Sequence, residues 1–477
     1  MFKHTFIYFL SKGVPGIINF IGIALYTRLL STEEYGEYAL VIAAVTIVNS
    51  ALFHWLRLGL LRYNPKYEDN KKSMFISSMT ATFISIGLLT IILGSGIFIV
   101  YTPLHSLALL WFLGIGLLVM QSTFDLFTEY LRSELLSTLF GLVTSLKVTL
   151  SLGLALLFIQ VFNLGGEGII LGLFFGNFLS VVFFLPKHLH LFNFKIINKN
   201  MIKEVVIYSI PFIAALSMEA IILNTDRYLI GWFLSKGAVG IYAVSYDLAK
   251  QILFLLMMII NLAAYPLVIK ALETDGIKAC QKQLNQNTAM LLLVALPATI
   301  GMILLSEPFT QIILGKEFLG KSATIFSLIS FAILLQGIKM FYFDLAFQLG
   351  KNTKLQIYPV IAAALLNILL NLIFIPKYGI VGSAYATILA YMSSLFLSAF
   401  IGKKIFPLSF PFREVGKILI ATVGMGLIIW STLKFEGTIA FVFQTTIGLI
   451  SYSSFVLILN ILNIRTLLGK KLKKSPE

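Results

Sequence analysis

The chain has 477 residues, of which 58% are apolar and only 12% are charged, and its mean hydropathy is +0.93. Soluble domains average about 45–50% apolar and about 25% charged residues, so this composition excludes a soluble globular protein. Stretches of about 20 apolar residues, each long enough to cross a bilayer, recur from one end to the other. The sequence therefore predicts an all-α polytopic membrane protein.

The apolar runs predict about fourteen transmembrane helices, because lipid offers no partner for unpaired backbone groups and a helix satisfies its own. In chain order they are expected near 6–30, 36–58, 74–101, 105–131, 136–162, 167–186, 204–234, 238–266, 286–305, 323–349, 355–375, 379–401, 413–433 and 438–463.

The formal net charge of +15 is distributed unevenly along these predicted helices and loops. With the N-terminus placed inside, the predicted inside segments hold 24 of the 36 Lys and Arg residues, and the outside segments hold 5. This asymmetry follows the positive-inside rule and predicts a multi-pass protein with both termini in the cytoplasm. Topology therefore explains the basic charge, with membrane phosphates as neighbours, and no nucleic-acid partner is expected.

The polar segment RLLSTEEYGEYALVIA (28–43) has a counterpart in WFLSKGAVGIYAVSYD (232–247). The three glutamates of the segment 28–43 are expected to form the solvated face of an outside turn. Four residues match at a constant offset of 204, namely Ser31, Gly36, Tyr38 and Ala39 with Ser235, Gly240, Tyr242 and Ala243. A second pair of turns matches at an offset of 214, Gly165 and Gly168 with Gly379 and Gly382. Chance similarity of Gly-rich turns is the alternative.

These matches predict two pseudo-symmetric six-helix bundles, 1–190 and 200–402. Because six is even, both bundles would enter the membrane in the same direction, as a parallel repeat about an axis along the membrane normal. Two additional transmembrane helices, 413–463, and a basic cytoplasmic tail, 464–477, lie outside the repeat.

The segment TRLLSTEEYGEYAL (27–40) resembles the polysaccharide-biosynthesis flippases, Wzx-type, of the multidrug/oligosaccharidyl-lipid/polysaccharide exporter superfamily. The segment IPKYGIVGSAYATILAY (375–391) is similar to the turn into helix twelve of that family. The resemblance extends over essentially the whole chain. It implies that the two bundles form a V around a central cavity.

The same resemblance implies the activity. It is the flipping of undecaprenyl-pyrophosphate-linked oligosaccharide from the inner to the outer leaflet, by alternating access, during O-antigen or capsular polysaccharide biosynthesis. The location implied is the bacterial cytoplasmic membrane. The partners implied are the lipid-linked oligosaccharide, membrane lipids and other polysaccharide-assembly proteins.

Cations inside the predicted spans are candidates for binding the pyrophosphate. An ionisable residue facing lipid at mid-helix costs about 2.5–3.5 kcal/mol on the insertion scale, so several together are expected to face protein or water. Lys and Arg there would offset the desolvation of a pyrophosphate. The candidates are Lys147, Lys339, Arg28, Arg227, Lys250 and Arg57.

Each cation also has a structural interpretation. Lys147 and Lys339 lie deep, one in each predicted half, and an internal ion pair is the alternative for both. Arg57 lies near a helix end, from which it can extend to the headgroups. Lys250 can pair with an acid three residues earlier, and Arg227 with the acid beside it. Arg28 can cap its helix or pair with a glutamate.

Acidic residues inside the spans are candidates for coupling to H+ or Na+. They are Asp125, Glu129, Glu219, Asp226, Asp247 and Asp344. Asp125 and Glu129 lie four residues apart and so share one helix face. Membrane potential acting on an anionic cargo is a further possible driving force.

Several other classes of site have no sequence motif here. There is no GxxxxGK[ST] and no HExxH, so neither an ATP site nor a zincin site is expected. The single cysteine, Cys280, excludes an intramolecular disulfide. No cofactor is expected. The alternatives to a flippase are a multidrug/cation antiporter of the same superfamily and a membrane enzyme of polysaccharide assembly, which the short loops disfavour.

Overall fold

The computed structural model describes the chain except for residues 1, 101–107, 185–192, 194–195 and 466–477. Most of the predicted tail, 464–477, and the predicted outside loop after residue 101 therefore lie outside the described residues. The described residues form helices and turns, with no strand among them.

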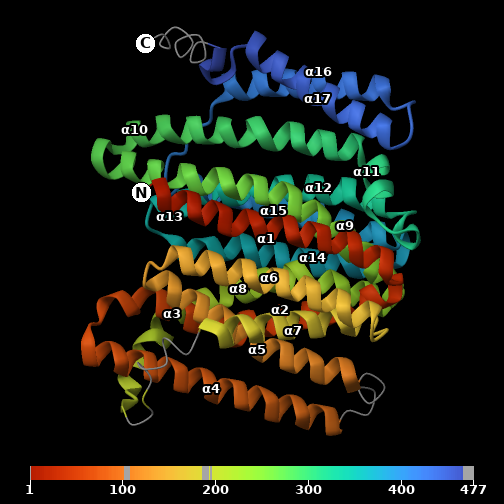
Figure 1. The fold of residues 1–477 in the computed structure, drawn as a ribbon. Coiled ribbons are helices and arrows are strands. Elements are labelled where there is room, and N and C mark those ends of the chain that lie inside the picture. The colour runs from red at the N-terminus through yellow and green to blue at the C-terminus, as the bar shows by residue number, and fades with distance from the viewer. Residues whose placement is uncertain (1, 101–107, 185–192, 194–195, 466–477) are drawn as a thin grey trace, which may run out of the picture. The chain divides into compact units, whose positions relative to one another are not determined.

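The α-helices are identified by the labels of Figure 1. They are α1 (Phe2–Leu29), α2 (Thr32–Leu52), α3 (His54–Tyr63), α4 (Asp69–Val100), α5 (Ala108–Ser133), α6 (Ser137–Gln160), α7 (Gly166–Phe184), α8 (Lys199–Phe233), α9 (Lys236–Ala249), α10 (Leu255–Leu304), α11 (Ser306–Ile313), α12 (Ser322–Ile338), α13 (Leu345–Leu349), α14 (Ile357–Tyr378), α15 (Ile380–Lys403), α16 (Phe412–Thr432) and α17 (Thr438–Ile458).

Within the part of the chain that is described, eleven helical runs are long and apolar enough to cross a membrane. One of them, Lys236–Leu304, has 69 residues. At about 1.5 Å per residue it is roughly 100 Å long, about three times the hydrocarbon core of a bilayer, so it cannot be a single span. Its backbone breaks at Gly276, where φ is +81°. An all-helical membrane protein is therefore confirmed, while the number fourteen stays a prediction.

Two predicted boundaries differ from the structure. The predicted helix 36–58 is interrupted at Phe53, which separates α2 from α3. The predicted inside loop 267–285 is helical and belongs to α10. That stretch is polar but rich in Lys, Glu and Gln, which are good helix formers, so hydropathy alone ends the helix too early.

Two short π-helices interrupt the helices of the second half of the chain. They span Lys250–Phe254, between α9 and α10, and Lys339–Phe343, between α12 and α13. The rings of Phe254 and Phe341 lie 5.6 Å apart, so the two π-helices contact each other. Single π-turns are frequent at functional sites.

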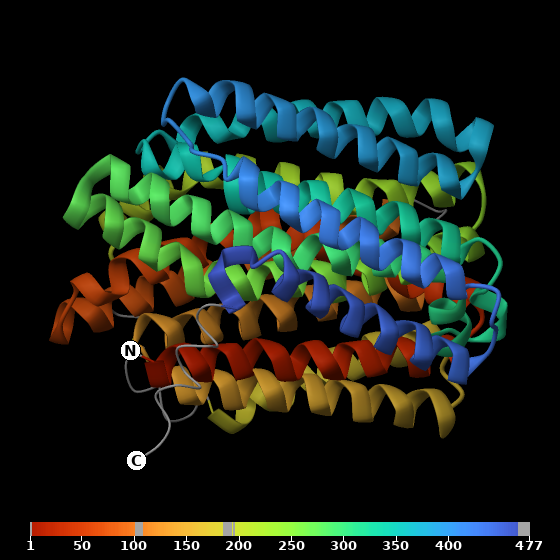
Figure 2. The ribbon, with the colours of Figure 1, turned by 90° about the horizontal axis from the view of Figure 1, so that it is seen from above.

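The chain divides into two compact units, Met1–Ala243 and Val244–Glu477. In the first unit α6 packs on α7 and on α1, and α2 packs on α5 and α8; α1 lies along α6 in both ribbon views (Figures 1 and 2). In the second unit α14 packs on α15, α12 on α15, and α10 on α12 and α16.

The first compact unit includes α8, which packs against α2 and α3. The Ser209 hydroxyl donates to the Trp55 carbonyl oxygen at 3.2 Å, and the Tyr63 and Tyr208 rings meet edge to face. The predicted domains 1–190, 200–402 and 413–463 stay a prediction.

The polar turn before α2 has a structural role. Ser31 and Glu34 form a capping box, in which the Ser31 hydroxyl accepts from the Glu34 amide at 3.3 Å and the Glu34 carboxylate accepts from the Ser31 amide at 2.8 Å. This arrangement satisfies amides that have no partner inside the helix. Glu37 pairs with Lys236 of α9 at 2.7 Å.

The two matching turns contact each other through Gly36 of α2 and Gly240 of α9. A Cβ on Gly36 would overlap the Lys236 carbonyl oxygen, and a Cβ on Gly240 would overlap the Thr32 carbonyl oxygen. Thr32 and Lys236 each precede one glycine by four residues, so the contact is reciprocal. Glycine permits this close backbone approach because it has no Cβ. The match at offset 204 thus marks a real contact, while symmetry of whole bundles stays a prediction.

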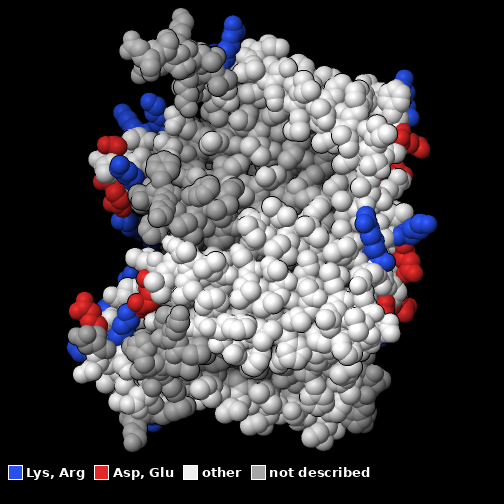
Figure 3. Space-filling model, in the orientation of Figure 1, with Lys and Arg blue, Asp and Glu red and all other residues white. Residues whose placement is uncertain are grey.

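Charged side chains gather near the helix ends on the face shown in Figure 3, and the surface between them carries other residues. The uncharged surface between the helix ends suits a hydrocarbon environment, because a charge exposed to lipid is costly.

Candidate functional site

A polar network joins α2, α3 and α5 inside the first unit. Asp125 of α5 accepts from the Arg57 Nη1 atom of α3 at 2.8 Å and from the Asn49 Nδ2 atom of α2 at 3.0 Å, both through the same oxygen. The Ser122 hydroxyl donates to the Asn49 Oδ1 atom at 3.1 Å. Asn49 and Ser122 are buried, and the Arg57 and Asp125 side chains are about one-fifth exposed.

Arg57 retains hydrogen-bonding capacity in this network. Its Nη2 atom lies 2.9 Å from His54 Nδ1. Its Nε atom is buried and has no hydrogen-bond partner among the described residues. Because a buried N–H without a partner is costly, the Nε donor is available to an incoming anion.

Lys147 of α6 adds a second cation beside this network. Its ammonium lies 5.4 Å from the centre of the Phe124 ring, within range for a cation–π contact. It interacts electrostatically with Asp125, but no carboxylate in the described part of the chain lies within 4.0 Å of it. Arg57 and Lys147 therefore share one carboxylate, and these three side chains carry a net charge of +1.

Glu129, one turn beyond Asp125 on α5, is engaged elsewhere. Arg132 Nη1 donates to both of its oxygens at 3.0 Å. Asp125 and Glu129 thus share one face of α5, but each carboxylate pairs with a different arginine.

Lys339 in the second unit has a different environment. It donates to Asp344 at 2.7 Å, and the two side chains are 9% and 1% exposed. Asp344 also accepts from the Ser398 hydroxyl at 2.7 Å and from Gln356 Nε2 at 3.2 Å. The structure therefore places Lys339 in a buried ion pair, and both oxygens of the Asp344 carboxylate accept hydrogen bonds.

The ion pair depends on the π-helix. The Asp344 amide donates to the Lys339 carbonyl at 2.8 Å, which is an i to i+5 bond. A π-turn brings residues five apart onto one face, whereas an α-helix brings together residues three and four apart.

Three predicted residues lie on α8. The buried Asp226 accepts from the Tyr242 hydroxyl at 2.7 Å. Arg227 is buried as well, and Glu219 is half-buried two turns earlier.

The remaining candidates lie at the end of α1 and at the end of α9. Arg28 is exposed in the last turn of α1. Asp247 and Lys250 are half-buried where α9 passes into its π-helix. Of the twelve predicted residues, the structure thus brings together Arg57, Asp125 and Lys147 in one cluster and Lys339 and Asp344 in another.

Several members of the two clusters were not among the predicted residues. They are Asn49, His54, Ser122, Gln356 and Ser398. Asn49 could have been predicted from the sequence, because an amide in a long apolar run is expected to hydrogen-bond across helices. His54 and Gln356 lie at helix ends, where polar residues are ordinary.

The fold is shared with transporters of known structure. The lipid II flippase MurJ, in an inward closed conformation, has a TM-score of 0.76 over 98% of this chain and 100% of its own, at 20% identity. An inward-facing multidrug resistance MATE family transporter has a TM-score of 0.63 over 86% of this chain and 98% of its own, at 12% identity. The chain therefore has the all-helical membrane fold that MurJ and the MATE family transporter share.

The family follows from the sequence. The family described as "Polysaccharide biosynthesis protein" matches residues 25–323, which is more than half of the chain. The chain belongs to this family, so the predicted resemblance to a polysaccharide-biosynthesis family is confirmed.

Two relatives come from Haloferax volcanii. The probable low-salt glycan biosynthesis flippase Agl15 is 25% identical over 206 residues, 42% of each chain. The probable flippase AglR is 21% identical over 222 residues, 44% of each chain. The chain thus aligns with less than half the length of these relatives.

Proposed function

We propose that this protein flips a lipid-linked oligosaccharide, joined through an anionic pyrophosphate, from the inner to the outer leaflet of the cytoplasmic membrane during surface polysaccharide synthesis. The observation that carries the proposal is the cluster of Arg57 and Lys147 around the single carboxylate of Asp125. Excess positive charge among membrane spans is expensive unless an anion uses it. The names of the relatives and of MurJ support the same class of cargo.

In this proposal Arg57 and Lys147 contact the pyrophosphate. Arg57 offers its buried Nε donor, and Lys147 offers an ammonium that shares the Asp125 carboxylate with Arg57 and has no carboxylate of its own within 4.0 Å among the described residues. Asp125 holds Arg57 in place between cargo molecules. Lys339 acts through its pair with Asp344, as part of the framework of the second unit.

The remaining features of the proposal concern the transport cycle. Fourteen spans place both termini in the cytoplasm, and two six-helix bundles alternate access to a central cavity. Protons or sodium couple through the intramembrane acids, of which Asp226 and Glu219 on α8 are candidates.

The test is lipid transport by the purified protein in liposomes. A fluorescent polyprenyl-pyrophosphate oligosaccharide is followed as it becomes accessible in the outer leaflet, with and without an imposed proton or sodium gradient. Protein-dependent movement is expected, and Lys147→Ala is expected to lower it roughly 30-fold at low cargo concentration without loss of folded protein. Full transport by Lys147→Ala combined with Lys339→Ala would show that neither lysine holds the cargo.

A multidrug/cation antiporter is the second candidate, because the MATE family transporter shares the fold. Gradient-driven uptake of a cationic dye, with no movement of any glycolipid in a panel of glycans, would favour that function.

A further inference from the structure

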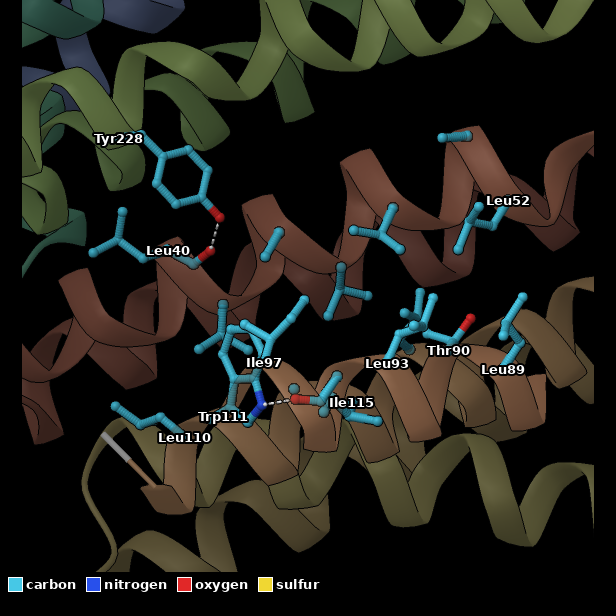
Figure 4. Close-up of a pocket in the computed structure, with 18 of the residues that line it drawn as sticks. Leu40, Leu52, Leu89, Thr90, Leu93, Ile97, Leu110, Trp111, Ile115 and Tyr228 are labelled. Atoms are coloured by element: carbon cyan, nitrogen blue, oxygen red, sulfur yellow. Dashed lines mark hydrogen bonds between the residues drawn. The ribbon is translucent and has the colours of Figure 1, made fainter. Parts of the chain in front are cut away.

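An apolar groove of about 620 Å³ lies in the first unit, between α2 on one side and α4 and α5 on the other (Figure 4). Leu40 and Leu52 of α2 face Leu89 and Leu93 of α4 and Ile115 of α5. Its volume lies within the range of roughly 300–1,000 Å³ that is typical of small-molecule sites. All three helices are candidate membrane spans, so the groove lies within the membrane.

The polar groups that line the groove are already hydrogen-bonded. The Thr90 hydroxyl donates to the Ile86 carbonyl at 2.8 Å, and Trp111 Nε1 donates to the Gly94 carbonyl at 3.0 Å. The Tyr228 hydroxyl donates to the Leu40 carbonyl at 2.9 Å. Glu37 and Lys236, the charged residues of the lining, pair with each other at one end. The wall therefore offers hydrocarbon contacts, and the matching ligand is a hydrocarbon chain.

The length of the groove distinguishes between lipid chains. On α2 it extends from Glu37 to Leu52, 16 residues that measure roughly 24 Å at about 1.5 Å per residue. One leaflet of the hydrocarbon core is only about 15 Å deep. A phospholipid acyl chain ends near the midplane and would leave part of the groove unfilled, whereas a polyisoprenoid chain is long enough to fill it.

The groove adjoins the charged cluster. Val45 of α2 lines the groove, and Asn49 of the polar network lies one turn beyond it on the same helix face. Leu118 of α5 lines the groove, and Ser122 lies one turn beyond it. Trp55 of α3 lines the groove as well. An apolar wall that meets a net positive cluster complements an anionic headgroup with a long hydrocarbon chain.

We infer that this groove binds the polyisoprenoid chain of the lipid-linked cargo while its pyrophosphate contacts Arg57 and Lys147. The inference rests on the proposed function, and it adds a site for the part of the cargo that carries no charge. The chain stays against α2, α4 and α5 while the headgroup is held, so both parts of the amphiphile are bound by one unit.

Photo-cross-linking tests the occupant directly. Leu89 lines the groove, and Leu88, one residue earlier on α4, does not; the two are 54% and 55% exposed. Each is replaced in turn by p-benzoylphenylalanine in the full chain, in vesicles of phosphatidylethanolamine and phosphatidylglycerol that contain a polyprenyl-pyrophosphate-linked disaccharide. Mass spectrometry then identifies the lipid in each adduct.

The glycolipid adduct is expected to be about tenfold more abundant at position 89 than at position 88, a preference of about 1.4 kcal/mol. A probe whose chain is short enough to remain in one leaflet is expected to lose that preference. Equal glycolipid yields at the two positions would overturn the inference, and so would a phospholipid adduct at position 89 that the glycolipid does not displace.

Transport provides a second readout, with Leu89→Trp as the variant and Leu88→Trp as its matched control. Filling the groove is expected to lower transport of the long-chain glycolipid about tenfold, with the control near wild type. Equal transport by the two variants would overturn the role of the groove. Absence of transport by the wild-type protein would instead contradict the proposed function, and the cross-linking ratio would still decide whether the groove holds the polyisoprenoid chain.

Discussion

Lys147 and Lys339 are both lysines deep in apolar helices, but their surroundings differ. Lys339 in the second unit donates to Asp344, and that carboxylate has two further hydrogen-bond donors. Lys147 in the first unit lies against the Phe124 ring and near Asp125. The Asp125 carboxylate already accepts hydrogen bonds from Arg57 and Asn49. A buried lysine with its own counter-ion stabilises the fold. A lysine that shares its counter-ion with an arginine is suited to bind an anion.

The largest expected effect comes from removing the counter-ion of Lys339. Asp344→Ala leaves a buried ammonium unpaired, which costs about 3–5 kcal/mol of stability. The midpoint of thermal unfolding in detergent is expected to fall sharply. Replacing both partners by apolar residues, Lys339→Met with Asp344→Leu, is the control and is expected to recover most of the stability. An Asp344→Ala protein as stable as the wild type would refute the framework role.

Lys147→Ala is expected to act on transport, with little effect on unfolding. A hydrogen bond to a charged group contributes about 1.5–3 kcal/mol, so transport at low cargo concentration should fall by roughly 30-fold. Lys147→Arg should retain most of the activity, because it preserves the charge. Wild-type transport by Lys147→Ala would remove this lysine from the cargo site.

Giving Lys147 a counter-ion should make it resemble Lys339. Thr144 lies three residues before Lys147 on α6, so the side chains are neighbours on the helix surface. Thr144→Glu is expected to lower transport about fivefold, roughly 1 kcal/mol, by competing with the cargo for the ammonium. Thr144→Gln has the same size without the charge. Equal loss in the two variants would point to bulk as the cause.

The smallest effect is expected at an exposed ion pair. Lys66 and Glu204 lie 3.4 Å apart, with side chains 59% and 43% exposed. Lys66→Ala should change the free energy of unfolding by less than about 1 kcal/mol, because water and salt already screen both charges. A loss as large as that of Asp344→Ala would mean that burial does not explain the difference between the ion pairs.

The contrast between the two lysines could be predicted only in part. Depth in the span follows from the run of apolar residues, so both were predicted as buried cations. The partner of Lys339 lies five residues away. In a regular α-helix, side chains at that spacing point in different directions, but the π-turn places both on one face. The partners of Arg57 are 68 residues away on α5 and three residues away on α3, and no local pattern indicates the distant contact.

By itself, the sequence determined the class, the helical architecture and the family, because the tendency of a segment to enter lipid depends on the composition of that segment and its motifs are local. The match at offset 204 predicted a repeat, whereas the contact between Gly36 and Gly240 is a finding of the structure. Tertiary structure decided which buried charges are neutralised, which amides join them, and where α2, α4 and α5 leave an apolar groove. These features depend on distances between side chains from separate helices, and packing sets those distances.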